Sequence, residues 1–194
     1  MFDKYYQLFR VFNNVVKLVQ LRGYTIDPID YETFKKKYVM YDTIVRSSLN
    51  RVVQQHLSVI FHDNPTFTMV HVKEIQTYFT QHDIRHCILV TINTPSSNIL
   101  RELHRIHGVQ IEVFTDKELL YNPLEHKNVP EYRVLSQDEF ENVKESYNMT
   151  NDNFPLMNKT DIISKWLNLK RGTVLEISSH SETSGKYVSY RMVQ

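Results

Sequence analysis

Hydrophobic residues near the N-terminus recur at three- and four-residue steps. They are Tyr5, Leu8, Phe9, Phe12, Val15, Val16 and Val19. This spacing predicts one apolar face on a helix from about Asp3 to Arg22. Gly23 follows, at the position where helix ends favour a positive φ. Since basic residues are too sparse on the polar face for a membrane-surface helix, we interpret the segment as a core-packing helix.

A second, shorter helix is predicted after Asp27-Pro28, because this pair is typical of an N-cap followed by a proline in the first turn. We expect this helix to continue to about Tyr38. Its Lys35-Lys36-Lys37 run could be a localisation or phosphate-binding signal, but we interpret it as a solvated helix face.

Residues 67–122 alternate between β-rich and helical patterns. Strands are expected at Phe67–Val72, His86–Ile92 and Gln110–Phe114. Helices are expected around Ile75–Phe79, from near Pro95 through Ile106, and at Lys117–Tyr121. Such alternation predicts an α/β layer with at least partly parallel strands. The apolar run Ile88-Leu89-Val90 indicates a central strand that is buried on both faces.

The pattern changes at Asn122-Pro123, and a polar linker runs from Leu124 to Pro130. Ser136-Gln137-Asp138-Glu139 is a capping box that opens a helix to about Tyr147. The other expected elements are a strand at Tyr132–Leu135, a turn at 151–155, a helix at Asp161–Leu169, and a hairpin of Thr173–Ser178 with Tyr187–Val193. The sequence therefore predicts an α/β domain at residues 1–124 and a small α+β domain at residues 125–194.

Composition excludes several classes of protein. The 194 residues carry 23 Lys and Arg against 22 Asp and Glu, a formal net charge of +1. Neither half is basic enough for a nucleic-acid binder that acts alone, since residues 1–124 hold 14 basic and 12 acidic side chains. One cysteine, Cys87, excludes an intrachain disulfide. No run of about 20 apolar residues exists to span a bilayer, and charges interrupt any signal peptide. We expect a soluble intracellular protein without membrane association.

Metal chemistry has two candidate clusters. The first has residue types that bind zinc: His82, Asp83, His86 and Cys87, with His104 and His107 as a second pair. Cys87 opens a predicted buried strand, so its neighbours cannot converge easily, and scattered surface histidines are the better interpretation. The second is Glu125-His126-Lys127 with Asp116 upstream, which matches the Asp and Glu-x-Lys of Mg²⁺ nucleases. That string falls in the linker, where no strand would hold it. We expect neither a metal nor a cofactor.

Other enzyme signatures are missing from the sequence, including the P-loop, Gly-x-Gly-x-x-Gly and Gly-x-Ser-x-Gly motifs. One loop has a composition suited to phosphate, Thr94-Pro95-Ser96-Ser97-Asn98, followed by Arg101 and Arg105. Hydroxyls and backbone N–H groups at a helix N-terminus can meet a phosphate. Ordinary N-capping needs only one of these hydroxyls, and from the residues alone it is the preferred interpretation.

The last third of the chain carries spaced motifs: Leu169-Lys170-Arg171-Gly172-Thr173-Val174, then Ser181-Glu182-Thr183-Ser184-Gly185-Lys186-Tyr187, then Tyr190-Arg191. Together with His126–Pro130 and Phe154–Met157, they closely resemble the fifth subunit shared by the eukaryotic nuclear RNA polymerases. They are also similar to the corresponding small subunit of the archaeal RNA polymerase. Lys186 stands where the family has Arg, and Asp161-Ile162 departs from a family Asp-Pro.

The resemblance extends more weakly toward the N-terminus, through Arg22-Gly23-Tyr24, Phe34–Tyr38 and Thr94-Pro95-Ser96-Ser97. It favours the eukaryotic two-domain form over the archaeal one, which lacks the N-terminal domain. It implies that residues 1–124 form a jaw domain with a restriction-endonuclease-like fold and no nuclease chemistry. Residues 125–194 would be an assembly domain.

The resemblance also implies partners. The assembly domain would dock on the largest polymerase subunit, through Lys170, Arg171, Gly172, Ser181, Glu182, Thr183, Gly185, Lys186, Tyr187, Tyr190 and Arg191. The jaw would lie beside downstream double-stranded DNA, with Thr94, Pro95, Ser96, Ser97 and Arg101 facing it weakly and without sequence preference. Other polymerase subunits and initiation factors are further expected partners.

Three functional hypotheses follow from the sequence. The leading one is a non-catalytic subunit of a multisubunit DNA-directed RNA polymerase, placed in the nucleus if cellular, or in a virion or cytoplasmic viral factory if virus-encoded. The alternatives are a free-standing Mg²⁺-dependent nuclease and a detached regulatory protein of the transcription machinery.

Tyr187 and Tyr190 are three apart on a strand, so we expect one in the core and one at the surface.

Overall fold

The computed structural model describes residues 4–24, 28–39, 57–62, 64–125, 129–150, 153–181 and 185–194. The chain separates into two compact units, Met1–Tyr121 and Asn122–Gln194. Among the described residues, no helix is both long enough and apolar enough to cross a membrane.

A three-stranded parallel sheet forms the centre of the N-terminal unit. Its strands are β1 (Leu57–His62), β2 (His86–Thr91) and β3 (Gln110–Thr115), in the order β1-β2-β3. All six residues of β2 are buried. The predictions of parallel strands and of a central strand at Ile88-Leu89-Val90 are therefore confirmed.

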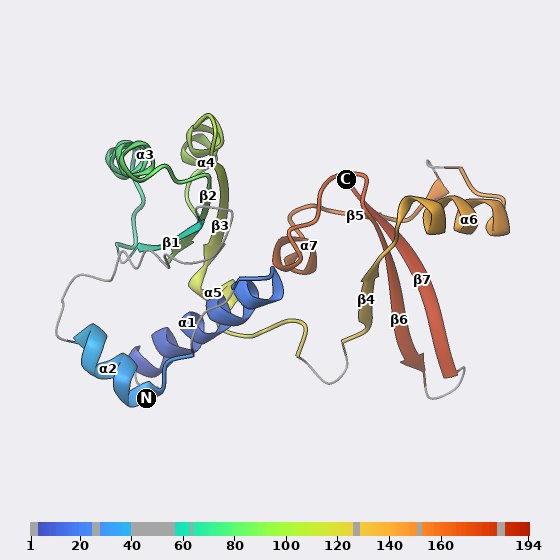
Figure 1. Ribbon diagram of the computed structural model, residues 1–194, viewed down its shortest axis with the longest axis horizontal. Coiled ribbons are helices and arrows are strands. Elements are labelled where there is room, and N and C mark those ends of the chain that lie inside the picture. Colours follow the sequence, from blue (N-terminus) through green and yellow to red (C-terminus); the bar gives the residue numbers. More distant parts are fainter. Residues whose placement is uncertain are drawn as a thin grey trace. The chain divides into compact units, whose positions relative to one another are not determined.

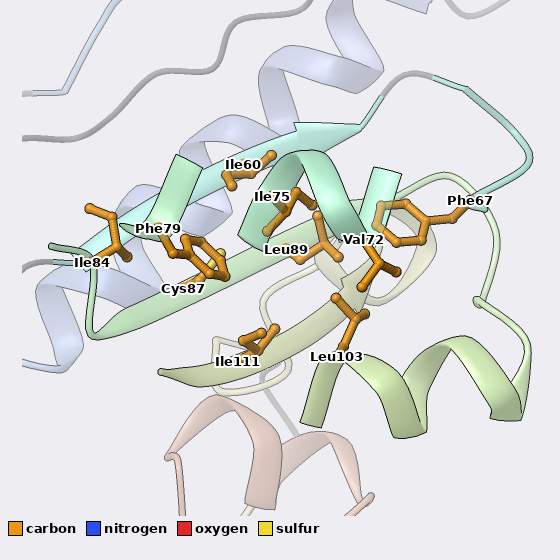
Figure 2. Close-up of a cluster of buried hydrophobic side chains, with 10 residues drawn as sticks. All are labelled: Ile60, Phe67, Val72, Ile75, Phe79, Ile84, Cys87, Leu89, Leu103 and Ile111. Carbon is orange, nitrogen blue, oxygen red and sulfur yellow. The ribbon is translucent and has the colours of Figure 1, made fainter. Parts of the chain in front are cut away.

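Helices α3 (Met69–His82) and α4 (Ser97–His104) are the two crossovers between these strands, and both cover the same face of the sheet (Figure 1). Beneath them lies a cluster of ten buried side chains drawn in Figure 2. Its members are Ile60, Phe67, Val72, Ile75, Phe79, Ile84, Cys87, Leu89, Leu103 and Ile111.

The opposite face of the sheet packs against α1 (Lys4–Leu21). Four residues of the predicted apolar face are almost completely buried, namely Phe12, Val15, Val16 and Val19. Leu8 and Phe9 are half-buried, and Leu18, which the predicted face did not include, is fully buried. Gly23 ends this helix with φ of 87°. The unit is completed by α2 (Tyr31–Val39) and α5 (Asp116–Leu119).

The predicted strand at Phe67–Val72 is wrong, since Met69 already begins α3. Two local features outweigh the β propensity of this run. The Thr68 N–H donates a hydrogen bond to His71 Nδ1 at 3.0 Å, which closes the first turn. Val72, Ile75 and Phe79 then fall on one buried helix face. The first strand of the sheet is instead β1, which the sequence did not reveal.

Helix boundaries also differ from the predicted ones. Asp27 lies outside the described residues, and α2 begins later, after Asp30, whose carboxylate accepts hydrogen bonds from the Thr33 N–H and hydroxyl at 2.7 Å. Helix α4 ends at His104, before Ile106. Lys35 and Lys36 are exposed, as expected for a solvated face. The Lys37 side chain lies outside the part that the structure describes.

A four-stranded mixed sheet forms the C-terminal unit, with the order β4-β6-β7-β5. The strands are β4 (Glu131–Val134), β5 (Leu156–Met157), β6 (Val174–Ser181) and β7 (Gly185–Val193). The antiparallel pair β6–β7 is the predicted hairpin, with a continuous register from Val174 opposite Met192 to Ser181 opposite Gly185.

Two helices cover opposite faces of this sheet. Phe140 of α6 (Gln137–Tyr147) packs in one cluster with Val174, and Ile163 of α7 (Ile162–Trp166) packs in another with Leu175. Since neighbouring strand residues point to opposite faces, the two helices lie on either side of β6. The capping box at Ser136 and Glu139 is confirmed. Helix α7 is shorter than predicted, because the chain turns at Asn168, whose φ is 49°.

Candidate nucleic-acid and protein interfaces

The loop singled out for phosphate lies between β2 and α4. Thr94, Ser96 and Ser97 are exposed, whereas Pro95 is buried. Ser96 precedes α4 with an extended backbone, and its hydroxyl makes no capping hydrogen bond. The capping interpretation therefore does not account for this hydroxyl, which stays at the surface with its neighbours.

A hydrogen bond to the turn after β1 holds this loop in place. The Asn93 side-chain amide donates to the Pro65 carbonyl at 3.1 Å, which joins it to the turn that follows β1. Both turns lie at the carboxyl ends of parallel strands, the edge at which open α/β sheets bind ligands. Arg101 is exposed one turn further along α4, and Arg105 pairs with Glu102. The hydroxyls of this loop are therefore exposed at that edge, and Arg101 is exposed on the helix that follows.

The zinc candidate is not formed. Cys87 is fully buried within the cluster of Figure 2, and this burial raises the pKa of its thiol far above the usual value. His86 points to the opposite face of β2, where its Nε2 lies 2.6 Å from Glu112. Across the described residues, no three His, Cys, Asp or Glu side chains come together as metal ligands.

The nuclease candidate is likewise not assembled. Asp116 is in the first turn of α5, and burial raises the pKa of its carboxyl. Glu125 is exposed in a bend and belongs to no strand, and Lys127 lies outside the described residues. The strand-borne geometry that would hold Mg²⁺ is therefore missing for Asp116 and Glu125.

A buried charge network, which the sequence reasoning missed, ties α1 to the sheet. Glu112 of β3 accepts two hydrogen bonds from the Arg22 guanidinium, at 2.7 and 2.8 Å, and the His86 bond from β2. The Arg22 and His86 side chains are less than one-tenth exposed. Burial alone would raise the pKa of Glu112, but the hydrogen bonds from His86 and Arg22 outweigh it and hold the pKa below its usual value. The network is structural, because it offers no open position to a substrate.

In the C-terminal unit, the Lys170-Arg171-Gly172 motif forms the turn between α7 and β6. Both basic side chains are exposed. Gly172 adopts φ of 83°, and its N–H donates to the Val193 carbonyl at 2.8 Å. A left-handed backbone at this point favours glycine. The turn therefore presents two cations beside the end of β7.

The motif that begins at Ser181 and the Tyr190-Arg191 motif belong to the β6–β7 hairpin. Gly185 has φ of 70° opposite Ser181, while Glu182 and Thr183 lie outside the described residues. Tyr187 is 57% exposed. Tyr190 packs against the α6 cluster, which confirms that the two tyrosines face different environments.

Cross-strand ion pairing in this sheet involves β4 and β6. Arg133 of β4 binds Glu176 of β6 at 3.0 Å and also pairs with Glu139 of α6. Within the described residues, Lys186 and Arg191 have no ion-pair partner, and both are exposed. Their charges therefore remain for a ligand or partner.

The C-terminal unit therefore carries exposed side chains at Lys170, Lys186 and Arg191 on a small mixed sheet. Residues 121–193 match the family model of the RNA polymerase Rpb5 C-terminal domain. This match confirms the resemblance drawn from the motifs at Lys170, Ser181 and Tyr190.

Relatives extend the similarity to the N-terminal unit. The chain is 28% identical over 204 aligned residues to the DNA-directed RNA polymerases I, II, and III subunit RPABC1 of Caenorhabditis elegans, covering 97% of this chain and 96% of that protein. The Dictyostelium discoideum subunit is 23% identical over 190 residues, with 96% of each chain covered. The chain is thus similar to this shared polymerase subunit over nearly its whole length.

Proposed function

We propose that this chain is a non-catalytic subunit of a multisubunit DNA-directed RNA polymerase. The match of residues 121–193 to the Rpb5 C-terminal domain carries the proposal, because it spans nearly the whole C-terminal unit. Relatives that are polymerase subunits align with both units. The unassembled Asp116 and Glu125 leave the nuclease alternative without support.

The C-terminal domain, residues 125–194, acts as the assembly domain that docks on the largest polymerase subunit. The exposed side chains of Lys170, Arg171, Lys186, Tyr187 and Arg191 support this role. Folding of the unit itself does not account for their positions. Gly172 and Gly185 shape the turn and the hairpin, and Tyr190 holds β7 against α6. Ser181, Glu182 and Thr183 complete the proposed surface.

The N-terminal domain, residues 1–124, acts as part of the lower jaw beside downstream DNA, with a restriction-endonuclease-like fold that has no nuclease chemistry. Its parallel sheet with helices on both faces is compatible with that fold. Thr94, Pro95, Ser96, Ser97 and Arg101 form the part of the jaw that faces the duplex. Such contacts position DNA without reading its sequence.

The charge balance suits a subunit better than a free DNA-binding protein. Sequence-independent affinity scales with the number of phosphates neutralised, and the chain has a net charge of only +1. Within an assembly, docking makes each additional DNA contact effectively intramolecular. Initiation factors are further partners of the jaw in this proposal. The protein would act in the nucleus, or in a viral particle or factory if it is virus-encoded.

Arg191→Ala tests the assembly role. We expect the tagged variant to fold normally, because Arg191 is exposed, and to co-purify with the largest polymerase subunit at least about tenfold less well than wild type, since a lost charge contact at an interface costs about 1.4 kcal/mol or more. Arg85→Ala is the matched control, since Arg85 is an exposed arginine of the N-terminal unit. Normal co-purification of Arg191→Ala would contradict the assigned surface.

Ser96→Ala combined with Arg101→Ala tests the DNA-facing loop. We expect normal incorporation into polymerase and weaker retention of downstream DNA as salt is raised, with the salt slope reduced by about one for the lost phosphate contact. An unchanged salt dependence of open-complex stability would remove this loop from the DNA path.

A further inference from the structure

Strand β7 has one long side without a neighbour. It pairs with β6 along its whole length, from Gly185 to Met192. On its other side, β5 pairs only with Met192 and Val193. From Gly185 to Arg191, no strand of the described residues lies along this outer edge (Figure 1).

Hydrogen bonds at the end of β7 reveal which backbone groups point outward. The Val193 N–H donates to the Thr173 carbonyl at 2.9 Å, on the β6 side. The Met192 N–H donates to the Pro155 carbonyl at 2.9 Å, on the β5 side. Because these directions alternate along an antiparallel pair, the N–H and C=O groups of Lys186, Val188 and Tyr190 point to the outer edge. No backbone partner for these six groups exists in the part of the chain that the structure describes.

Little protects this edge from pairing with another chain. Between Gly185 and Val193 there is no proline, and the unbroken register with β6 leaves no bulge to twist the strand away. Natural proteins usually block an exposed edge by such devices, and a flat uncovered edge is a template for a further strand. Within the residues that the structure describes, charge at Lys186 and Arg191 is the one such device on this strand.

The side chains along β7 indicate what kind of strand would fit. Tyr187 is 57% exposed on one face and Val188 is 37% exposed on the other. Lys186 and Arg191 are exposed on either side of this apolar centre, and β7 contains no acidic residue. A complementary segment is therefore apolar in the middle and carries carboxylates toward its ends.

We propose that the outer edge of β7 accepts an extended, acidic segment of the largest polymerase subunit as a fifth strand of the sheet. This inference rests on the proposed function and specifies the mode of docking. Main-chain hydrogen bonds to Lys186, Val188 and Tyr190 supply the attachment, and the flanking side chains supply the selectivity. The five residues from Lys186 to Tyr190 give a strand about 17 Å long, at roughly 3.4 Å per residue.

Amide hydrogen exchange at single-residue resolution tests the proposal, in the full chain alone and in polymerase purified with it. In the free chain, we expect fast exchange at Lys186, Val188 and Tyr190 and slow exchange at Ser189 and Arg191, whose amides face β6. In the assembled polymerase, the three outward amides slow by about tenfold or more, while the inward amides change little.

Val188→Pro and Val188→Thr provide a matched pair of variants. Proline removes only an outward N–H and is tolerated on an edge strand, whereas threonine keeps the N–H and the branched shape. We expect Val188→Pro to lower co-purification with the largest subunit by about tenfold and Val188→Thr to leave it near wild type. The exchange experiment uses the unmodified chain, so it decides the matter even if the proline variant does not fold.

The possible outcomes distinguish the added strand from the polymerase role. Stoichiometric co-purification with outward amides that still exchange as in the free chain overturns the added strand and leaves the polymerase role intact. Failure to associate with polymerase at all overturns both. Protection of the outward amides in the free chain that grows with protein concentration would identify a second copy as the occupant, and would contradict the proposed partner.

Discussion

The sheet of the N-terminal unit keeps its charges inside, whereas the sheet of the C-terminal unit carries its charges on the surface. In the first, Arg22, Glu112 and His86 form a closed network between α1 and the strands. In the second, Lys186 and Arg191 project from β7. Polar groups satisfied within a unit stabilise its fold. Exposed cations and an open strand edge contribute little to folding and suit a partner, which supports the proposal that the C-terminal unit serves assembly.

The two units can be followed separately in one sample. Trp166 is the single tryptophan of the chain and is fully buried in the C-terminal unit, so its fluorescence reports on that unit. Helical circular dichroism is dominated by α1, α3 and the other helices of the N-terminal unit.

The largest effect is expected from Glu112→Ala. Removing the carboxylate leaves the Arg22 guanidinium buried without this partner, which costs about 3–5 kcal/mol for a broken buried ion pair. The unfolding transition seen by circular dichroism in urea should move to lower concentration, while the Trp166 fluorescence transition stays in place. Equal shifts of both transitions would contradict the separation into two units.

The same network predicts a pH dependence. The folded-state pKa of Glu112 lies below the ordinary value of 4.5, so its contribution to stability is fully present above about pH 4.5 and is lost as the pH falls through the folded pKa. Glu112→Gln, which cannot ionise, should flatten this acid-side loss in the circular dichroism transition. Glu102→Gln, at a surface position, serves as the control and should leave the loss unchanged.

Gly172→Ala should have an intermediate effect, confined to the C-terminal unit. A Cβ at this position meets nothing within 4 Å, so the cost arises from the positive φ of 83° alone. A left-handed backbone costs a non-glycine residue about 1–2 kcal/mol. We expect the free energy of unfolding measured by Trp166 fluorescence to fall by that amount. A shift of several kcal/mol would indicate a clash that the structure does not contain.

Two serines that precede helices form a matched pair with a smaller expected effect on stability. The Ser136 hydroxyl accepts a hydrogen bond from the Glu139 N–H at the start of α6, so Ser136→Ala should cost about 1 kcal/mol. The Ser96 hydroxyl makes no such bond, and Ser96→Ala should leave the circular dichroism transition almost unchanged. A comparable loss for Ser96→Ala would restore the capping interpretation of that loop.

Tyr187→Ala should change stability least, because exposed substitutions usually stay within about 0.5 kcal/mol. Its effect should appear instead as weaker incorporation into polymerase. Tyr190→Phe is a useful companion variant, since it keeps the ring that packs on α6. A large drop in the Trp166 midpoint for Tyr187→Ala would show that this side chain serves the fold.

The sequence predicted those elements whose signals are local and strong. The apolar face of α1, the β2 run and the Ser136 capping box each lie within one short window. It failed where tertiary structure decides: the β propensity of Phe67–Val72 yielded to the first turn of α3, and β5, with two residues, leaves no periodic signal.

The candidate sites follow the same rule. The exposed motifs at Lys170 and Gly185 could be predicted because a family motif is a short run of contiguous residues. The Arg22–Glu112 pair joins residues 90 positions apart, so no local pattern reveals it. A lone glutamate within an apolar strand, at Glu112, was the one available signal. The open edge of β7 depends on strand order, which only the structure contains.

The polymerase role is tested most directly by affinity purification of the tagged full-length chain from its native source, with identification of its stoichiometric partners. The account predicts that two very large polymerase subunits are recovered in one-to-one ratio with the chain. Recovery of the chain alone, from a lysate in which polymerase is intact, would contradict it.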